Sequence, residues 1–428
     1  MSTRAEIADP APHTPGTVRA LGTGLITGAA DDDPSAIGTY ASAGAAFGPA
    51  LLWTAPVTFP MMFAVVYLSA KLGQVAGQGL FAVLRKHFPR WLLYPTLAAV
   101  LIGNTIEAGA DLGGIAAAAG IVVPIPPAVI VVGAAAIMLG LQIAGSYPLL
   151  RNVFRVLALA LLAYIPAAIL AHPKWSQVLS ATFRPAVHFN KSFLSMLVAI
   201  VGTTLSAYLY TWQSNEEVEE EIAQGRTRLR QRKGATDQEL QHSRRDVISG
   251  MLFSNLAMYF IILATSAALF ESGKKDIASA ADAARALAPI AGNAAGLLFA
   301  LGVVGVGFLA VPVMTTGAAY DLCQTIGWEY GLSRKPAEAK RFYLATAGFT
   351  VLAVAINFLG FDPMKALVTA GIVQGFSTPP LMLLILLMTN DRRIMGARAN
   401  GWAINILGWV TTVALFAATL GLIASWVL

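Results

Sequence analysis

The sequence has few charged residues and a single cysteine. Only 12% of its 428 residues are Asp, Glu, Lys or Arg, and 56% are hydrophobic, whereas soluble globular chains carry about 25% charged residues. The mean hydropathy is +0.65. These values exclude a disordered chain and an ordinary soluble enzyme, and the lone Cys323 excludes an internal disulfide or a metal site of several cysteines. The composition is that of a polytopic membrane protein.

The signatures of enzymes and ATP-driven pumps are also missing. There is no GxxxxGK-type phosphate loop, no nucleophile–base pair and no cofactor motif, so we expect neither an enzyme nor a cofactor. All five histidines fall in loops or termini of the predicted topology. The basic residues lie between apolar runs, which indicates contact with the lipid bilayer and its headgroups rather than with nucleic acid. Residues 1–17 do not read as a signal peptide.

Eleven segments are apolar enough to cross a membrane, which takes about 20 residues. Most Lys and Arg residues fall between them on one side, which predicts a multi-pass protein of the cell (cytoplasmic) membrane with its N-terminus inside and its C-terminus outside. The predicted spans lie near 18–47, 50–73, 91–119, 127–146, 152–171, 193–219, 246–270, 292–325, 341–359, 364–388 and 402–427.

The predicted organisation has two halves. The longest loop, at about 222–245, follows a run of glutamates and then turns basic, and we expect a solvated helical extension there. The predicted parts are a cytoplasmic tail at 1–17, a first five-helix repeat at 18–171, an extracellular loop at 172–192, a second inverted five-helix repeat at 193–388, and an eleventh helix with the C-terminus at 389–428.

The first span contains three adjacent carboxylates, Asp31, Asp32 and Asp33, directly before Pro34. One charge at the bilayer centre costs about 2.5–3.5 kcal/mol, so three need strong compensation. Proline disfavours helical geometry in the residue before it, and the helix should therefore break at Asp33. Carboxylates together with freed backbone carbonyls are the ligands of a hard cation. The segment predicts an ion site; the alternative is a re-entrant turn whose aspartates face water.

The sixth span is polar at its centre, from Gly202 to Tyr210, and includes Thr203 and Ser206. This favours a second broken helix, although a continuous helix with small residues for packing is the alternative. Spans one and six are five helices apart and enter the membrane from opposite sides. That is the pattern of a five-plus-five inverted repeat with its substrate bound where the two breaks meet.

Two further spans carry polar residues. Asn104, Glu107 and Asp111 share one face of the third span, which indicates either a path for protons or ions or a buried hydrogen-bond network. Gln374 in the tenth span is either a ligand or a residue that joins helices. From the residues alone, the roles of the polar face of the third span and of Gln374 both stay open.

Four segments resemble the Nramp-type divalent metal transporters. They are DDDPSAIGTYASAGAAFGPALLW, GADLGG, TTGAAYDLCQ and GIVQGF, and the resemblance extends from about Gly22 to Met388. It implies an all-α LeuT-like fold with broken helices one and six, eleven transmembrane helices, a monomer, and a transported divalent metal ion. It also implies roles for single residues: Asp33 and Gln374 at the metal, Asp111 on a proton path, and a helix-six break at Gly202 and Thr203.

The chain departs from the Nramp pattern at several of the aligned positions. Ala36 replaces an Asn, Asn104 a Glu and Gln213 a His, while Ser206 to Tyr208 replace Met-Pro-His. Without the thioether, the predicted site contains only oxygen ligands, which suits hard cations. The chain thus resembles the divergent Nramp-related branch associated with Mg²⁺.

The predicted function is import of Mg²⁺ and/or Mn²⁺ by alternating access. Two alternatives stay open: a symporter for a small organic solute on the same fold, and a non-transporting metal sensor or scaffold. The predicted metal ligands are Asp33, Asp32, Thr203, Ser206 and Gln374. The predicted gating or path residues are Asp31, Glu107, Asp111, Asn104 and Tyr208.

Overall fold

The computed structural model describes residues 23–144, 162–277, 280–284, 292 and 295–427. Within these residues all regular structure is helical, and eight helical stretches are long and apolar enough to cross a membrane. This confirms the all-α polytopic fold, while the number of eleven spans stays a prediction. The predicted tail at 1–17 and the first half of the predicted fifth span, 152–161, lie outside the described residues.

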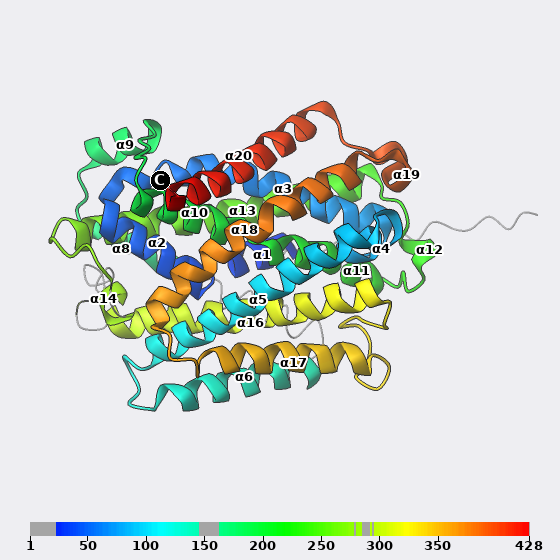
Figure 1. Ribbon diagram of the computed structural model, residues 1–428, viewed down its shortest axis with the longest axis horizontal. Coiled ribbons are helices and arrows are strands. Elements are labelled where there is room, and N and C mark those ends of the chain that lie inside the picture. Colours follow the sequence, from blue (N-terminus) through cyan, green and yellow to red (C-terminus); the bar gives the residue numbers. More distant parts are fainter. Residues whose placement is uncertain (1–22, 145–161, 278–279, 285–291, 293–294, 428) are drawn as a thin grey trace, which may run out of the picture.

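The described helices follow one another along the chain and run mostly along the long axis of the molecule (Figure 1). Their bounds are α1 Thr23–Asp31, α2 Pro34–Phe47, η1 Gly48–Leu51, α3 Thr54–Ala76, α4 Leu80–His87, α5 Arg90–Ala119, α6 Pro127–Ala144, α8 Tyr164–Leu170, α9 Trp175–Phe183, α10 Lys191–Thr204, α11 Ala207–Ala223, α12 Leu229–Arg232, α13 Asp237–Thr265, η3 Ser266–Phe270, α14 Ala280–Ala284, α16 Ala295–Ile326, α17 Lys340–Ile356, α18 Pro363–Asn390, α19 Arg392–Met395, η6 Gly396–Arg398 and α20 Trp402–Val427.

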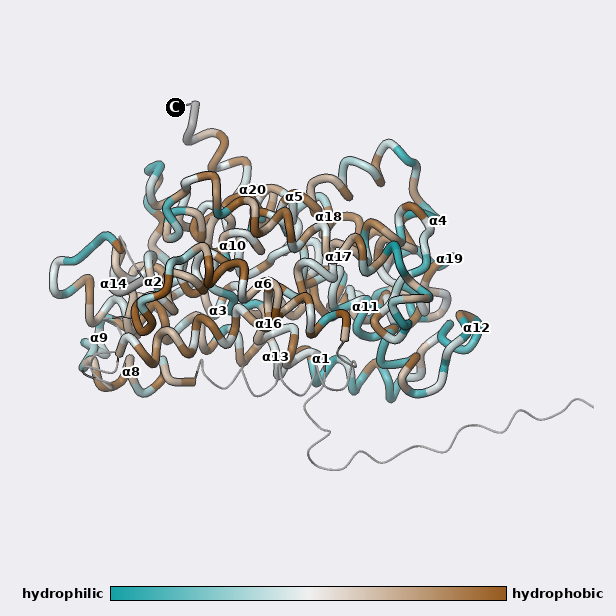
Figure 2. The backbone as a smooth tube through the Cα atoms, turned by 90° about the horizontal axis from the view of Figure 1, so that it is seen from below, coloured by the Kyte–Doolittle hydropathy of each residue, from teal (hydrophilic) through white to brown (hydrophobic). Residues whose placement is uncertain are grey.

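The two ends of the bundle differ in charge. Helices α4, α12 and α19 gather at one end, and α8, α9 and α14 at the other (Figures 1 and 2). Hydrophilic backbone is concentrated around α11 and α12 in Figure 2. We call the end with α4, α12 and α19 the basic end, because the last turns of these three short helices carry Arg85, Lys86, Arg230, Arg232, Arg392 and Arg393. Which end faces the cytoplasm stays a prediction.

The predicted break in the first span is confirmed. Helix α1 ends at Asp31 and α2 begins at Pro34, and Asp33 has extended backbone (φ −61°, ψ 172°). The Asp33 side chain accepts a hydrogen bond from the amide of Ala36 at 2.7 Å and so caps α2. Proline fits the first position of a helix because its missing N–H has no partner there anyway. The break therefore follows from the Asp-Pro pair.

The sixth span is also broken, but not where the resemblance implied. Helix α10 continues through Gly202 and Thr203, and α11 begins only after Leu205 and Ser206. Gly202 serves close packing instead, since a Cβ built on it would lie 2.0 Å from the carbonyl oxygen of Gly371 on α18. The predicted break at Gly202 and Thr203 is therefore wrong by a few residues.

The predicted loop at about 222–245 is shorter than expected. Helix α11 extends to Ala223, and α13 begins at Asp237, inside the predicted loop. The early start has a local cause: the hydroxyl of Thr236 accepts the amide of Glu239 at 3.2 Å, and Glu239 accepts the amide of Thr236 at 2.7 Å. This reciprocal capping box satisfies two amides of the first helical turn.

Four of the five glutamates of α11 are buried, all but Glu220, so the prediction of a solvated extension is wrong for this part of the chain. Glu216 is 1% exposed and Glu219 is 2% exposed. The central position of α11 explains this, because the helix packs against α3, α4, α5 and α16 along its length. Buried carboxylates need hydrogen-bond donors, and for Glu217 and Glu219 these come from α3, α11, α13, α16 and the turn after α16.

Candidate cation site

Asp33 lies at the meeting point of the two broken helices. Its side chain is fully buried, and Oδ1 accepts hydrogen bonds from the Ser35 hydroxyl at 2.8 Å and the Ala36 amide at 2.7 Å. The Tyr208 hydroxyl on α11 lies 3.1 Å from Oδ2 of Asp33 and 2.6 Å from the carbonyl oxygen of Ala30. The single hydroxyl hydrogen can form a well-aligned hydrogen bond to only one of these two oxygens. Tyr208 can therefore give up its contact with Asp33 and still donate to the carbonyl oxygen of Ala30.

Ser35 connects Asp33 to the third predicted span, which is α5. Its hydroxyl lies 3.1 Å from Oε1 of Glu107 and 3.3 Å from the hydroxyl of Thr203, and its amide donates to Oδ1 of Asp111 at 2.9 Å. Sequence reasoning did not single out Ser35. The available signal was its position in the first turn after the break, where a small hydroxyl side chain can reach both broken helices.

Gln374 and Ser206 converge on Glu107 rather than directly on Asp33. Gln374 on α18 donates to Oε2 of Glu107 at 2.6 Å and to Oδ1 of Asn104 at 3.2 Å. The Ser206 hydroxyl lies 3.3 Å from Oε1 of Glu107 and 2.9 Å from the carbonyl oxygen of Thr203. The structure thus brings these predicted residues into one hydrogen-bonded cluster around Glu107.

Asp31 and Asp32 face a different helix. The hydroxyl of Ser254 on α13 donates to Oδ2 of Asp31 at 2.5 Å and lies 3.3 Å from Oδ1 of Asp32. The acidic triplet is therefore divided: Asp33 contacts α11 directly and α5 through Ser35, whereas its two neighbours face α13. Ser254 was not predicted, because a single serine in an apolar span carries no distinctive signal.

The site holds an excess of potential negative charge. Five carboxylic side chains are fully buried there: Asp31, Asp32, Asp33, Glu107 and Asp111. In the part of the chain that the structure describes, none of the five forms an ion pair with Lys or Arg. One oxygen each of Asp31, Asp32 and Asp111 is buried without a hydrogen-bond partner. Buried charges without partners are costly, so the cluster is suited to a cation or to protons.

The geometry favours a mixed set of oxygen ligands. Among the described residues, no three His, Cys, Asp or Glu side chains are arranged to hold one metal ion between them. A cation at Asp33 would therefore meet few carboxylates, with hydroxyl, amide and carbonyl oxygens around them. Ions such as Mg²⁺, which keep several waters and bind through one or two carboxylates, fit such a set.

A second polar network leads from α1 to a buried glutamate. The Thr27 hydroxyl donates to Gln213 at 2.5 Å, and Gln213 donates to Glu217 at 2.9 Å. Gln74 on α3 and Ser243 on α13 also donate to Glu217, at 2.7 Å and 3.0 Å. These donors explain how Glu217 is accommodated inside the bundle, which the sequence analysis had not anticipated.

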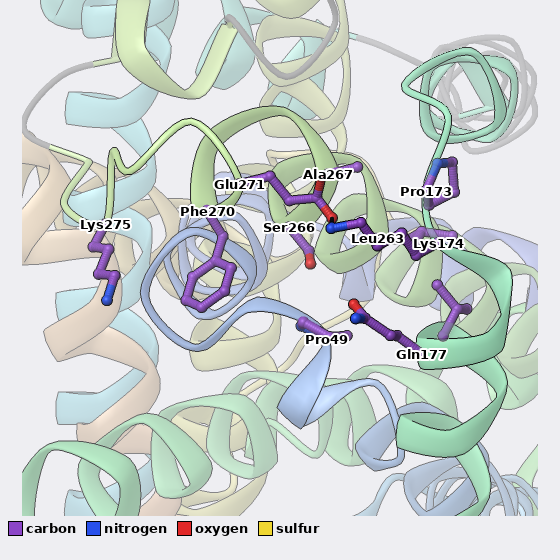
Figure 3. A pocket seen from close by; sticks show the side chains of 11 residues that line it. Pro49, Pro173, Lys174, Gln177, Leu263, Ser266, Ala267, Phe270, Glu271 and Lys275 are labelled. Atoms are coloured by element: carbon purple, nitrogen blue, oxygen red, sulfur yellow. Dashed lines mark ion pairs between the residues drawn. The ribbon is translucent and has the colours of Figure 1, made fainter.

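A cavity of about 490 Å³ lies at the end of the bundle opposite to the basic end, near α9 and η3 (Figure 3). It is separate from the candidate site. Lys174 and Glu271 face each other there at 3.5 Å, and the Lys275 ammonium lies 5.3 Å from the centre of the Phe270 ring. None of the predicted site residues lines this cavity. The candidate site is instead the buried cluster around Asp33.

The bundle contains two broken helices. The Asp33 carboxylate at the first break contacts Tyr208, which follows the second break. These features define the class of broken-helix membrane transporters. Residues 24–425 match the family model described as natural resistance-associated macrophage protein-like. The chain belongs to the Nramp family.

Known proteins support this assignment. The chain is 27% identical over 407 residues to the divalent metal cation transporter MntH of Deinococcus radiodurans, which covers 93% of this chain and 87% of the relative. A crystal structure of the Eremococcus coleocola manganese transporter has a TM-score of 0.71 at 18% identity, with 94% and 85% of the two chains covered. The nucleobase-cation-symport-1 transporter Mhp1 has a TM-score of 0.57 at 13% identity, with 95% and 91% covered. At these identities the two structures establish the fold alone, and they confirm the predicted LeuT-like architecture.

Proposed function

We propose that the protein imports divalent cations, Mg²⁺ and/or Mn²⁺, into the cell by alternating access. The observation that carries this proposal is the buried cluster of five carboxylic side chains, none of which is ion-paired with a Lys or Arg among the described residues. A divalent cation supplies the missing positive charge. The names of the relatives from D. radiodurans and E. coleocola, which refer to divalent metal and manganese transport, support the same class of substrate.

Asp33 supplies the charged ligand in this proposal. It is fully buried, lies at the break before α2, and is held by hydroxyl and amide donors that a cation can displace or reorient. Asp32, Ser206, Gln374 and the backbone near Thr203 supply further oxygens directly or through retained waters. This oxygen-rich set favours hard ions, and the absence of a thioether at Ser206 removes a preference for softer ones.

Alternating access would release the cation toward the basic end. Helix α1 is held there by the Gly24 amide, which donates to Asp246 at 2.6 Å, and by the Thr27 hydroxyl, which donates to Gln213 at 2.5 Å. These hydrogen bonds join a nine-residue half-helix to α13 and α11, and α1 also packs closely on α13, with Gly24 and Gly28 against the backbone of Asp246 and Gly250. A short half-helix that ends at a break is a suitable moving part for a hinge-type opening, and such an opening would have to separate these packed surfaces.

The charge balance also bears on the alternatives. A small organic solute with a carboxylate would meet five buried acids and no paired basic group in the described site, which is unfavourable by like-charge repulsion. A metal sensor without transport would retain cation binding but lack flux. Transport measurements therefore separate the proposal from a sensor, and competition by amino acids separates it from a solute symporter.

The direct test compares Asp33→Asn with wild type in proteoliposomes that contain a Mg²⁺ or Mn²⁺ indicator. Asn caps helices about as well as Asp, so the variant removes charge while preserving the start of α2. We expect uptake to fall about tenfold or more, because an interaction with a charged group contributes about 1.5–3 kcal/mol. Asp362→Asn is a matched control, since Asp362 is an exposed cap that also precedes a proline. Equal uptake by Asp33→Asn and wild type would remove Asp33 from the transport mechanism.

A further inference from the structure

A second cavity, of about 700 Å³, lies at the basic end. It is formed by α4, α11, α12, α16 and the turn that follows α16, and it is separate from the cluster around Asp33. Its lining combines positive charge with aromatic rings. The residues that characterise it are Arg85, Lys86, Arg232, Arg334, Trp328 and Tyr330.

The two acidic residues of this lining are already satisfied. Glu219 accepts hydrogen bonds from the Tyr320 hydroxyl at 2.6 Å and from the amides of Leu332 and Ser333, each at 3.0 Å. Glu329 forms an ion pair with Arg334 at 2.5 Å. The acids therefore fix the turn after α16, and among the described residues neither of them forms an ion pair with Arg85, Lys86 or Arg232.

Arg85 has most of its hydrogen-bonding capacity left. Its Nη1 lies 3.5 Å from the carbonyl oxygen of Gln324, which is the outer limit of a hydrogen bond. Lys86 is its neighbour, and the pKa of the Lys86 ammonium is lowered by burial and by the nearby charges of Lys233 and Arg85. An anion bound beside Lys86 would offset this repulsion and favour the charged form of its ammonium.

The backbone around Arg85 is shaped to leave room for it. Gly327 has φ +88°, and a Cβ on it would lie 2.0 Å from Nη1 of Arg85, so a larger residue would displace the guanidinium. Trp328 is held in place by Arg341, whose guanidinium carbon lies 5.0 Å from the ring centre. Tyr330 packs edge-on against Tyr320 at 5.8 Å. The cavity is thus preformed rather than a gap between mobile side chains.

We propose that this cavity binds a phosphate-bearing anion, with Arg85 and Lys86 as its main contacts. Guanidinium groups bind phosphate oxygens through paired hydrogen bonds, and a neighbouring ammonium adds a point charge. The source is either a soluble phosphate compound or the headgroup of an anionic lipid. The proposal concerns binding alone and is independent of which cation is transported.

An anion bound in this cavity would act on α11, the half-helix that follows the second break of the candidate transport site. At the floor of the cavity, Gln324 on α16 donates to Asn215 on α11 at 2.5 Å. Arg85 on α4 reaches the end of α16 at Gln324. An anion held by Arg85 and Lys86 would therefore lie beside the contact between α4, α11 and α16, where it would favour the arrangement of these helices that leaves both basic groups facing the cavity.

The test uses purified full-length protein in metal-free buffer. In phosphatidylcholine nanodiscs, sodium pyrophosphate is titrated by calorimetry, and thermal unfolding is followed at matched ionic strength with sodium chloride. A parallel series compares these discs with discs that contain phosphatidylglycerol. We expect saturable binding or stabilisation in at least one arm, and the R85Q/K86Q variant should weaken it about tenfold or more. The matched control R392Q/R393Q removes two exposed charges at the same end and should behave as wild type.

The pyrophosphate titration and the phosphatidylglycerol series distinguish a soluble phosphate compound from a lipid headgroup. Saturation by pyrophosphate identifies a soluble phosphate compound, whereas stabilisation only by phosphatidylglycerol identifies a lipid headgroup. Equal responses of R85Q/K86Q and R392Q/R393Q, or no saturable response of the wild type in either arm, would overturn the proposal. If R85Q/K86Q unfolds, R85Q alone tests the same contact.

Discussion

The hydroxyl oxygen of Ser35 lies 3.1 Å from Oε1 of Glu107. This contact joins the first turn of α2 to the centre of α5, and the same hydroxyl lies 2.8 Å from Asp33. A neutral group between two carboxylates reduces the cost of bringing them together, because it can donate to either one. Ser35 therefore belongs to the candidate site although it carries no charge.

Replacing Ser35 by alanine should weaken cation binding. Ser35→Ala removes a donor shared by Asp33 and Glu107, so we expect the dissociation constant for Mg²⁺, measured by calorimetry, to rise about tenfold. The matched control is Ser249→Ala, since Ser249 is exposed and its hydroxyl bonds only within α13. An unchanged constant in Ser35→Ala would show that the hydroxyl is dispensable for binding.

The identity of residue 206 should control ion preference. Because Ser206 lies at the second break, 3.3 Å from Glu107, a thioether there would face the same cluster. We expect Ser206→Met to make Mn²⁺ uptake less sensitive to competing Mg²⁺ than in wild type, because sulfur favours the softer ion. Radiolabelled Mn²⁺ uptake in excess Mg²⁺ measures this. Ser206→Leu supplies similar bulk without sulfur, and the same shift in that variant would contradict the argument.

A methyl group at Gly202 should be poorly tolerated. The new Cβ would lie 2.0 Å from a backbone oxygen of Gly371, so α10 and α18 would have to separate, and we expect a loss of stability of about 1–3 kcal/mol. Gly302 on α16 is the control, because nothing lies within 4 Å of a Cβ built there. Gly302→Ala should be neutral or stabilising by about 0.5–1 kcal/mol. Thermal unfolding in detergent compares the two, and equal melting temperatures would show that the helices can separate at little cost.

Local chemistry predicted the first break better than the second. Asp33 and Pro34 fix the start of α2 through a side-chain cap and a restricted backbone, and both effects act within a few residues. The second break has no proline, and the sequence indicates it only through the polar stretch from Gly202 to Tyr210 and through the alignment of Gly202 and Thr203 with the break of the family. In the structure, Gly202 allows the close approach of Gly371 on α18. A glycine that is required by packing against another helix cannot be recognised from the sequence of its own span.

The same distinction applies to the polar residues. The spacing of Asn104, Glu107 and Asp111 correctly placed them on one face, since helical periodicity is a local property. The burial of Glu217 could not be predicted, because its donors come from α3, α11 and α13, which are distant in sequence. Ser254 was missed for the same reason.

The two oxygens of Asp33 have partners of different kinds: Oδ1 accepts hydrogen bonds from the Ala36 amide and the Ser35 hydroxyl, while Oδ2 faces the Tyr208 hydroxyl. One oxygen of this carboxylate thus caps α2, and the other contacts α11, which follows the second break. If Asp33 binds the cation as proposed, the ion would also pull on the first turn of α2, because the same carboxylate caps that turn. Ion occupancy and the position of α2 would then be coupled through this one side chain.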